Sequence, residues 1–98
     1  MNENVKGGDV IKDALGKIET LYEAEKDKNL LLDAYYYAQK MHEGQKRASG
    51  EPYFIHPCAV ANILMDMGLD APTIAAAFLH DVVEDTAATE EDIRTKFG

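Results

Sequence analysis

Apolar residues recur every three or four positions along most of this chain, the spacing that places them on one face of an α-helix. The pattern predicts a first helix that is capped by Asp9 and runs to about Tyr22. The charged stretch 26–29 interrupts the pattern, and we expect it to separate the first helix from a second, from about Leu30 to Glu43. The predicted inner stripe of this second helix is Leu31, Ala34, Tyr35, Ala38, Met41 and His42. Gly44 suits its C-terminal end.

The same spacing continues in the second half of the chain. A third helix is predicted from about His56 to Met67, with Gly68 as its stop, and its apolar positions Val60, Ile63, Leu64 and Met67 are spaced for one face. Asp70 opens a fourth helix that runs through Val82, and Thr89 is the cap of a short last helix. No segment alternates with the two-residue period of a strand. We therefore predict an all-α bundle of about five helices.

Length and composition indicate one small domain. We treat residues 1–98 as a single unit, with 1–28 as a leading helix and 29–98 as the part that carries the candidate chemistry. The sequence contains no run of about 18 apolar residues, so we expect no membrane span. The first residues lack the apolar core of a secretory signal. Cys58 is the only cysteine, which excludes a disulfide framework. We expect this cysteine to be buried and the protein to be cytoplasmic.

The net charge of −8 is unevenly distributed. Residues 1–55 carry 8 basic and 10 acidic side chains, whereas residues 56–98 carry 2 and 8. An acidic chain repels nucleic-acid backbones, so duplex binding is not expected. Acidic groups around a site favour the binding of a cation. An anionic substrate would then need that cation and local basic residues to offset the negative charge of the acidic groups.

The strongest chemical signal lies in residues 78–86. His80 and Asp81 stand side by side in an otherwise apolar helical segment, and Glu84 and Asp85 follow one turn later. Imidazole nitrogens and carboxylate oxygens bind divalent transition metals. Adjacent helix residues point about 100° apart, so a further ligand must come from another helix. His56, at the start of the preceding helix, is the candidate. The alternative is a chance His-Asp pair; the nearby acids and His56 favour a metal site.

Residues 45–53 form the clearest irregular stretch. Gly50 and Pro52 forbid a regular helix there. The stretch gathers Lys46, Arg47 and the hydroxyl of Ser49 just before the candidate metal ligand, and loops held by rigid elements often carry ligand contacts. A solvated charged turn is the alternative interpretation.

From Ala38 to Gly98 the sequence closely resembles the N-terminal hydrolase domain of the RelA/SpoT family, an all-helical member of the HD superfamily of metal-dependent phosphohydrolases. The matching stretches are residues 42–45, Arg47, residues 49–53, His56-Pro57, residues 78–86 and Phe97-Gly98. Together these motifs are far more specific than the His-Asp pair by itself. The fold class expected from the resemblance is an HD-domain-like bundle that is incomplete at its C-terminal side.

The resemblance implies a role for each candidate. His56, His80 and Asp81 match the family's metal ligands, usually of Mn²⁺. Glu84 and Asp85 match the acids that orient and activate the attacking water. Arg47 and Ser49 occupy positions that contact the guanine nucleotide, and we include the neighbouring Lys46 as a substrate-binding candidate. The implied reaction removes the 3′-pyrophosphate from ppGpp or pppGpp, the nucleotides of the stringent response.

This sequence departs from the family pattern at two points. The family's fourth metal ligand is an aspartate that would lie beyond residue 98, and Ala48 stands where many active members carry a basic residue. We therefore expect this chain to be much slower than a complete domain, or inactive. We also expect the face normally covered by later helices to be exposed, so that the chain self-associates or folds loosely. The apolar positions expected to have fewer partners are Leu64, Ile74, Phe78 and Val82.

Two alternatives remain open. The chain could belong to an HD enzyme that acts on another nucleotide or phosphoester, or it could be a non-catalytic helical module that works by association.

Overall fold

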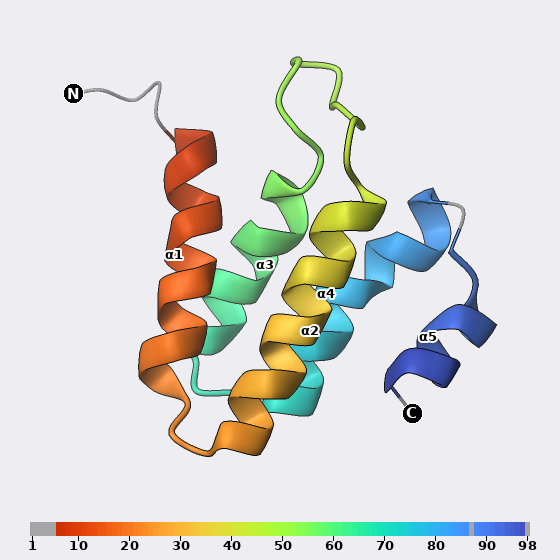
Figure 1. Cartoon of the computed structure of the whole chain (residues 1–98). Helices are drawn as coiled ribbons and strands as arrows, with labels where there is room; N and C mark the ends of the chain where they lie inside the picture. Colours follow the sequence, from red (N-terminus) through yellow and green to blue (C-terminus); the bar gives the residue numbers. More distant parts are fainter. Residues whose placement is uncertain (1–5, 87, 98) are drawn as a thin grey trace.

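The computed structural model describes residues 6–86 and 88–97, apart from the side chains of residues 6–8, 81 and 85. The described part of the chain forms five α-helices, shown in Figure 1: α1 (Lys6–Leu21), α2 (Glu25–Met41), α3 (Ile55–Asp66), α4 (Ala71–Asp85) and α5 (Glu90–Phe97). No described residue belongs to a β-strand, so the all-α prediction is confirmed. No helix within these described ranges is both long and apolar enough to cross a bilayer.

The first four helices pack against one another in pairs. α2 lies along α4 and α1 lies along α3, while contacts between α1 and α2 and between α3 and α4 complete the bundle. Figure 1 shows α5 to one side of this bundle, beyond the end of α4. The ring of Phe97 in α5 meets the edge of Tyr37 in α2, with ring centroids 5.6 Å apart. The short last helix therefore packs on the bundle through an aromatic contact.

The core lies where α2 and α4 face each other. The ring of Tyr35 is 3% exposed and meets Phe54 and Phe78 edge on, with centroids 5.2 and 5.9 Å away. Other buried apolar residues of the four packed helices are Ala14, Ile18, Leu31, Ala34, Ala38, Cys58, Ala61, Met65, Ile74 and Val82. Burial is the main cause that raises the pKa of Tyr35 to about 12, so its hydroxyl stays neutral at physiological pH.

Polar contacts fix α1 against α3. The side-chain amide of Asn62 donates to the carbonyl oxygen of Val10 at 3.2 Å, and the ammonium of Lys17 lies 3.1 Å from the carboxylate of Asp66. The carboxylate is exposed, so the ion pair contributes little stability. The hydrogen bond from Asn62 to Val10 joins residues far apart in sequence, and it therefore helps to set how the two helices lie along each other.

Local signals at several helix ends are confirmed. Gly44 and Gly68 adopt positive φ angles of 85° and 80° just beyond the ends of α2 and α3, a conformation that glycine adopts without strain. The carboxylate of Asp70 accepts a hydrogen bond from the Thr73 N–H at 3.3 Å and caps α4. Before α5, the Thr89 hydroxyl accepts from the Asp92 N–H at 3.1 Å. The Asp92 carboxylate accepts from the Thr89 N–H at 3.0 Å, which completes a reciprocal cap.

The predicted boundaries between α1 and α2 were wrong. α1 begins at Lys6, so Asp9 lies in its first turn instead of capping it, where its charge still favours the helix dipole. The break falls at residues 22–24, and residues 26–29 are helical. The first turn of α2 is mostly solvent-exposed, so its lack of apolar residues reflects exposure and not a loop.

The structure also corrects the predicted apolar face of α3. Val60, Ile63 and Met67 are 36%, 60% and 66% exposed, and Leu64 is only partly buried. The buried residues of this helix are Pro57, Cys58, Ala61 and Met65. Apolar side chains surround most of α3, so their spacing alone did not distinguish the inner face from the outer one.

The apolar positions expected to lack partners on α4 are buried by this chain itself. Ile74, Phe78 and Val82 are each 0% exposed, because α2 packs along α4. The predicted uncovered face at these residues was therefore wrong, and the exposed apolar stripe of the bundle lies on α3 instead.

Candidate functional site

The candidate site is built on the last two turns of α4. The Asp70 cap and Pro72 in the first turn start the helix, which continues to Asp85. It ends at Thr86, whose hydroxyl donates to the carbonyl oxygen of Val82 at 2.6 Å and accepts from the Ala88 N–H at 3.1 Å. Because residues 80–85 are helical, His80 and Glu84 fall on one face, as the sequence predicted.

His56 stands in the first turn of α3, opposite α4. Its N–H donates to the carbonyl oxygen of Tyr53 at 3.0 Å, which joins the start of the helix to the preceding loop. His56 and His80 line one open cavity of about 390 Å³ between the two helices. The other residues that line it are Pro57, Val60, Thr73, Ala76 and Ala77. The fold thus brings together two histidines that are 24 positions apart in sequence, one near the start of α3 and the other in the second half of α4.

A carboxylate lies beside one of these imidazoles. The Nε2 atom of His80 is 3.7 Å from a carboxylate oxygen of Glu84, one turn further along α4. The two side chains are 69% and 63% exposed, so the attraction is screened by water and adds little stability. The contact matters for its position: an acid stands next to a candidate metal ligand.

Two predicted site residues lie outside what the structure describes. The side chains of Asp81 and Asp85 are not among the described atoms, although their backbone belongs to α4. Among the described side chains, no three His, Cys, Asp or Glu residues come together as a metal-binding group. Of the three predicted ligands, the structure describes the side chains of His56 and His80, which line one cavity from two facing helices.

Cys58 lies in the core of the bundle. It is fully buried on α3, and burial raises the pKa of its thiol to about 12. A thiol with so high a pKa stays protonated at neutral pH. The prediction that this cysteine is buried is confirmed.

Residues 45–53 form a tight hairpin-like loop above the start of α3. The Gly50 N–H donates to the carbonyl oxygen of Arg47, and the Arg47 N–H donates to that of Glu51, both at 2.8 Å. Gly50 has a φ of 94°, as expected at the left-handed position that follows such a turn. Lys46, Arg47 and Ser49 are all exposed, and the cavity of the two histidines is lined by residues of α3 and α4 instead.

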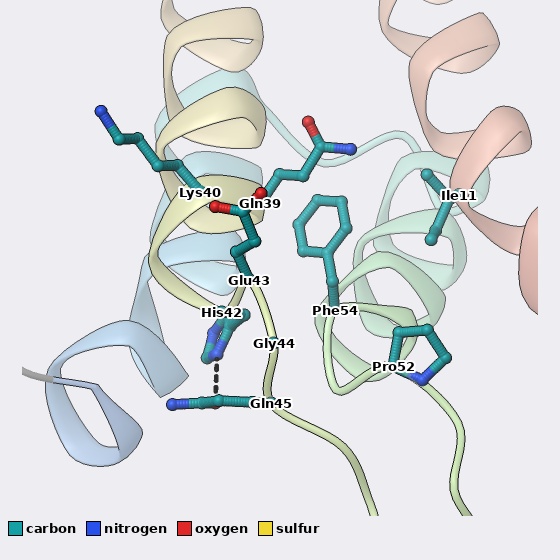
Figure 2. A pocket seen from close by; sticks show the side chains of 9 residues that line it. All are labelled: Ile11, Gln39, Lys40, His42, Glu43, Gly44, Gln45, Pro52 and Phe54. Atoms are coloured by element: carbon teal, nitrogen blue, oxygen red, sulfur yellow. Dashed lines mark hydrogen bonds between the residues drawn. The ribbon is translucent and has the colours of Figure 1, made fainter.

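The structure reveals a stack of rings that the sequence interpretation missed. His42 is 2% exposed, and its Nδ1 lies 2.9 Å from the side-chain oxygen of Gln45, the contact drawn in Figure 2. Its ring stacks on Tyr53, with centroids 4.9 Å apart and planes 27° apart. Tyr53 in turn meets the ring of His56 at 6.0 Å and 67°. A histidine on the buried stripe of α2, three residues before a glutamine, was the available signal.

A larger cavity lies elsewhere, between α1, the end of α2 and the loop. Its volume is about 570 Å³, and Figure 2 shows the residues around it, among them Ile11, Gln39 and Phe54. It contains none of the predicted metal ligands or catalytic acids.

Comparison with known proteins places the chain in a family. The family model described as HD domain matches residues 34–98. The chain is 54% identical over 77 residues to a GTP pyrophosphokinase rsh of Brucella melitensis, covering 79% of this chain and 10% of that protein. It is 49% identical over 86 residues to a guanosine-3′,5′-bis(diphosphate) 3′-pyrophosphohydrolase of Vibrio cholerae, covering 88% of this chain and 12% of the relative.

A third relative is the bifunctional (p)ppGpp synthase/hydrolase SpoT of Escherichia coli, with 49% identity over 86 residues, covering 88% of this chain and 12% of SpoT. The chain thus spans about a tenth of the length of the relatives it matches. The resemblance to RelA/SpoT proteins that the sequence motifs indicated is confirmed.

Proposed function

Since the chain belongs to the HD domain family, we propose that it is the N-terminal part of a metal-dependent hydrolase domain that degrades (p)ppGpp. The reaction removes the 3′-pyrophosphate of the guanine nucleotide and leaves GDP or GTP. The relatives whose names state this substrate support the proposal, because each aligns with most of this chain.

The observation that carries the proposal is the cavity shared by His56 and His80. Two imidazoles that line one cavity from separate helices can supply part of the ligand set of a divalent transition ion. We propose His56, His80 and Asp81 as the ligands and Mn²⁺ as the ion. When bound, such an ion offsets phosphate charge and lowers the pKa of a bound water.

The acids of α4 complete the proposed chemistry. Glu84 lies 3.7 Å from His80, so its carboxylate is beside the proposed ligand set and can take a proton from an attacking water. We assign Asp85 to the same task of orienting and activating water. In this assignment Glu84 acts on water and not as a metal ligand.

We propose that the loop 45–53 binds the nucleotide through Lys46, Arg47 and Ser49. All three are exposed, and the two cations supply positive charge that an otherwise acidic chain needs in order to attract a phosphorylated substrate. Backbone hydrogen bonds at 2.8 Å across the turn hold the loop in one shape, which supports a binding role.

We further propose that the protein acts in the cytoplasm and that copies of this chain associate. The stripe of Val60, Ile63 and Met67 on the outer face of α3 supports association, because exposed apolar residues tend to be covered. Sedimentation velocity at several concentrations tests this part. A monomer at every concentration would contradict it.

Calorimetric titration with Mn²⁺ tests the metal site. The wild-type chain should bind the ion, and His56→Ala and His80→Ala should each bind it at least tenfold more weakly. Glu91→Gln is a control for a change of a polar side chain that does not line the cavity, because Glu91 lies on α5 and pairs with Arg94 at 3.5 Å. Equal affinity in all four proteins would refute the site.

The substrate is tested by pyrophosphate release from ppGpp in a longer chain that includes the region following residue 98 in the relatives. We expect turnover with Mn²⁺ there, and at least 100-fold slower turnover by the 98-residue chain, since a small misplacement of substrate costs on the order of 100-fold. A longer chain that binds Mn²⁺ but releases no pyrophosphate would refute the substrate.

A further inference from the structure

Three rings connect the core of the bundle to the proposed metal ligand. His42 is the buried C-cap residue of α2, Tyr53 stacks on its face, and His56 lies at the edge of Tyr53. The two centroid distances are 4.9 and 6.0 Å, both within the range of direct ring contact. The row of rings runs from a buried imidazole, which also lines the larger cavity, to the cavity of the two histidines, so it can transmit the rigid placement of His42 to the site.

The first ring is held firmly. His42 is 2% exposed, and its Nδ1 donates to the side-chain oxygen of Gln45 at 2.9 Å. The N–H of Gln45 donates back to the carbonyl oxygen of His42, also at 2.9 Å. Among the described atoms, the buried Nε2 of His42 has no hydrogen-bond partner, which is unfavourable for a buried polar atom. The bond to Gln45 and the flat face offered to Tyr53 account for an imidazole at this costly position.

The second ring, that of Tyr53, is held in place through a backbone hydrogen bond to Gln45. The N–H of Tyr53 donates to the carbonyl oxygen of Gln45 at 2.9 Å, which closes the base of the loop. The carbonyl oxygen of Tyr53 accepts from the His56 N–H at 3.0 Å. The backbone and the ring of Tyr53 therefore both connect the hydrogen-bonded pair His42 and Gln45 to His56.

We propose that Tyr53 is a positioning residue that sets the orientation of the His56 imidazole in the cavity it shares with His80. The inference rests on the proposed function in so far as His56 binds a divalent ion. A ligand imidazole rotates about two bonds, and only a narrow part of that range points a nitrogen at an ion. Groups that orient a ligand in this way change metal affinity by about 10–100-fold when they are removed.

The test compares Tyr53→Leu with Tyr53→Phe and with the control Tyr37→Leu. Tyr37 is also half-buried and meets one other ring edge on, at 5.6 Å, but that ring is Phe97 in α5. The control thus loses a similar aromatic contact away from the cavity. Thermal unfolding without metal checks that each variant is folded.

Mn²⁺ affinity by calorimetry is the first measurement. Tyr53→Leu should bind about tenfold more weakly, whereas Tyr53→Phe and Tyr37→Leu should stay within about twofold of wild type. Wild-type affinity in Tyr53→Leu, or an equal loss in Tyr37→Leu, would overturn the inference. A tenfold loss in Tyr53→Phe would also overturn it, because the ring and not the hydroxyl is held responsible.

The second measurement needs no metal. The ring-proton resonances of His56 should shift in Tyr53→Leu and stay unchanged in Tyr37→Leu, because the aromatic ring beside His56 is removed only in the first. Unshifted resonances would overturn the inference even if Mn²⁺ binds. Absence of Mn²⁺ binding by wild type would instead refute the proposed metal site, while unshifted resonances would still overturn the ring contact on which the orientation of His56 by Tyr53 rests.

Discussion

The same substitution, glycine to alanine, should have opposite effects at two positions of this protein. Gly50 has a φ of 94°, and a Cβ added there would meet nothing within 4 Å. Gly16 lies inside α1, and a Cβ there would also meet nothing within 4 Å. Neither change produces a steric clash, so only the backbone conformation decides the sign.

The magnitudes follow from the two conformations. A left-handed backbone costs a non-glycine residue about 1–2 kcal/mol, so Gly50→Ala should lower the free energy of unfolding by that amount. In a helix interior, alanine is favoured over glycine by about 1 kcal/mol, so Gly16→Ala should raise it. For a domain of this size, 1 kcal/mol corresponds to about 4–8 °C, and the two melting temperatures should differ by about 8 °C or more.

Thermal and urea unfolding of both variants measure these shifts, and Gly50→Asn provides a graded case because asparagine tolerates the left-handed region better than alanine. We expect the order Gly16→Ala, wild type, Gly50→Asn, Gly50→Ala from most to least stable. Shifts of the same sign in the two alanine variants would refute the argument that backbone conformation alone decides.

Three further outcomes are expected. Burial raises the pKa of the Cys58 thiol from its ordinary 9.0 to about 12. The thiol therefore contributes fully to the free energy of unfolding below pH 9, and this contribution is lost as pH rises towards 12, because the unfolded state loses the proton first. Urea unfolding across this window should show Cys58→Ala losing about 1.4 kcal/mol less per pH unit than wild type; parallel curves would contradict this. In a longer chain, Glu84→Gln should abolish pyrophosphate release while Mn²⁺ affinity stays within about twofold, with Glu91→Gln retaining turnover; full activity in Glu84→Gln would show that its assigned role is wrong. Asp70→Ala removes the cap of α4 and should cost about 1 kcal/mol in the free energy of unfolding, and no loss would mean that the 3.3 Å bond contributes nothing.

Much of the secondary structure was predictable because its causes are local. Gly44 and Gly68 end helices through their own φ angles, and Asp70 and Thr89 cap helices through bonds that span three residues. Where the local signal was weak, the prediction failed. α2 begins at Glu25 after Ala24, which makes no side-chain cap bond, and charged residues in an exposed first turn resembled a loop.

The chemical character of the site was also evident from the sequence. Helical spacing alone places His80 and Glu84 on one face of α4, and the structure finds them 3.7 Å apart. The roles assigned to all of the candidate site residues remain predictions, because they rest on resemblance to the family: His56, His80, Asp81, Glu84, Asp85, Lys46, Arg47 and Ser49.

Tertiary structure decided what helical spacing left open. On α3, apolar residues surround most of the helix, so the inner face at Ala61 and Met65 was selected by the helices that pack there. The cavity shared by His56 and His80 depends on how α3 lies against α4, and the stack of His42 on Tyr53 depends on how the loop folds back over the end of α2. Caps, turns and helical spacing act over a few residues and can be read along the chain. Which face is buried and which side chains meet depend on the packing of distant segments, because the favourable burial of apolar surface is not directional.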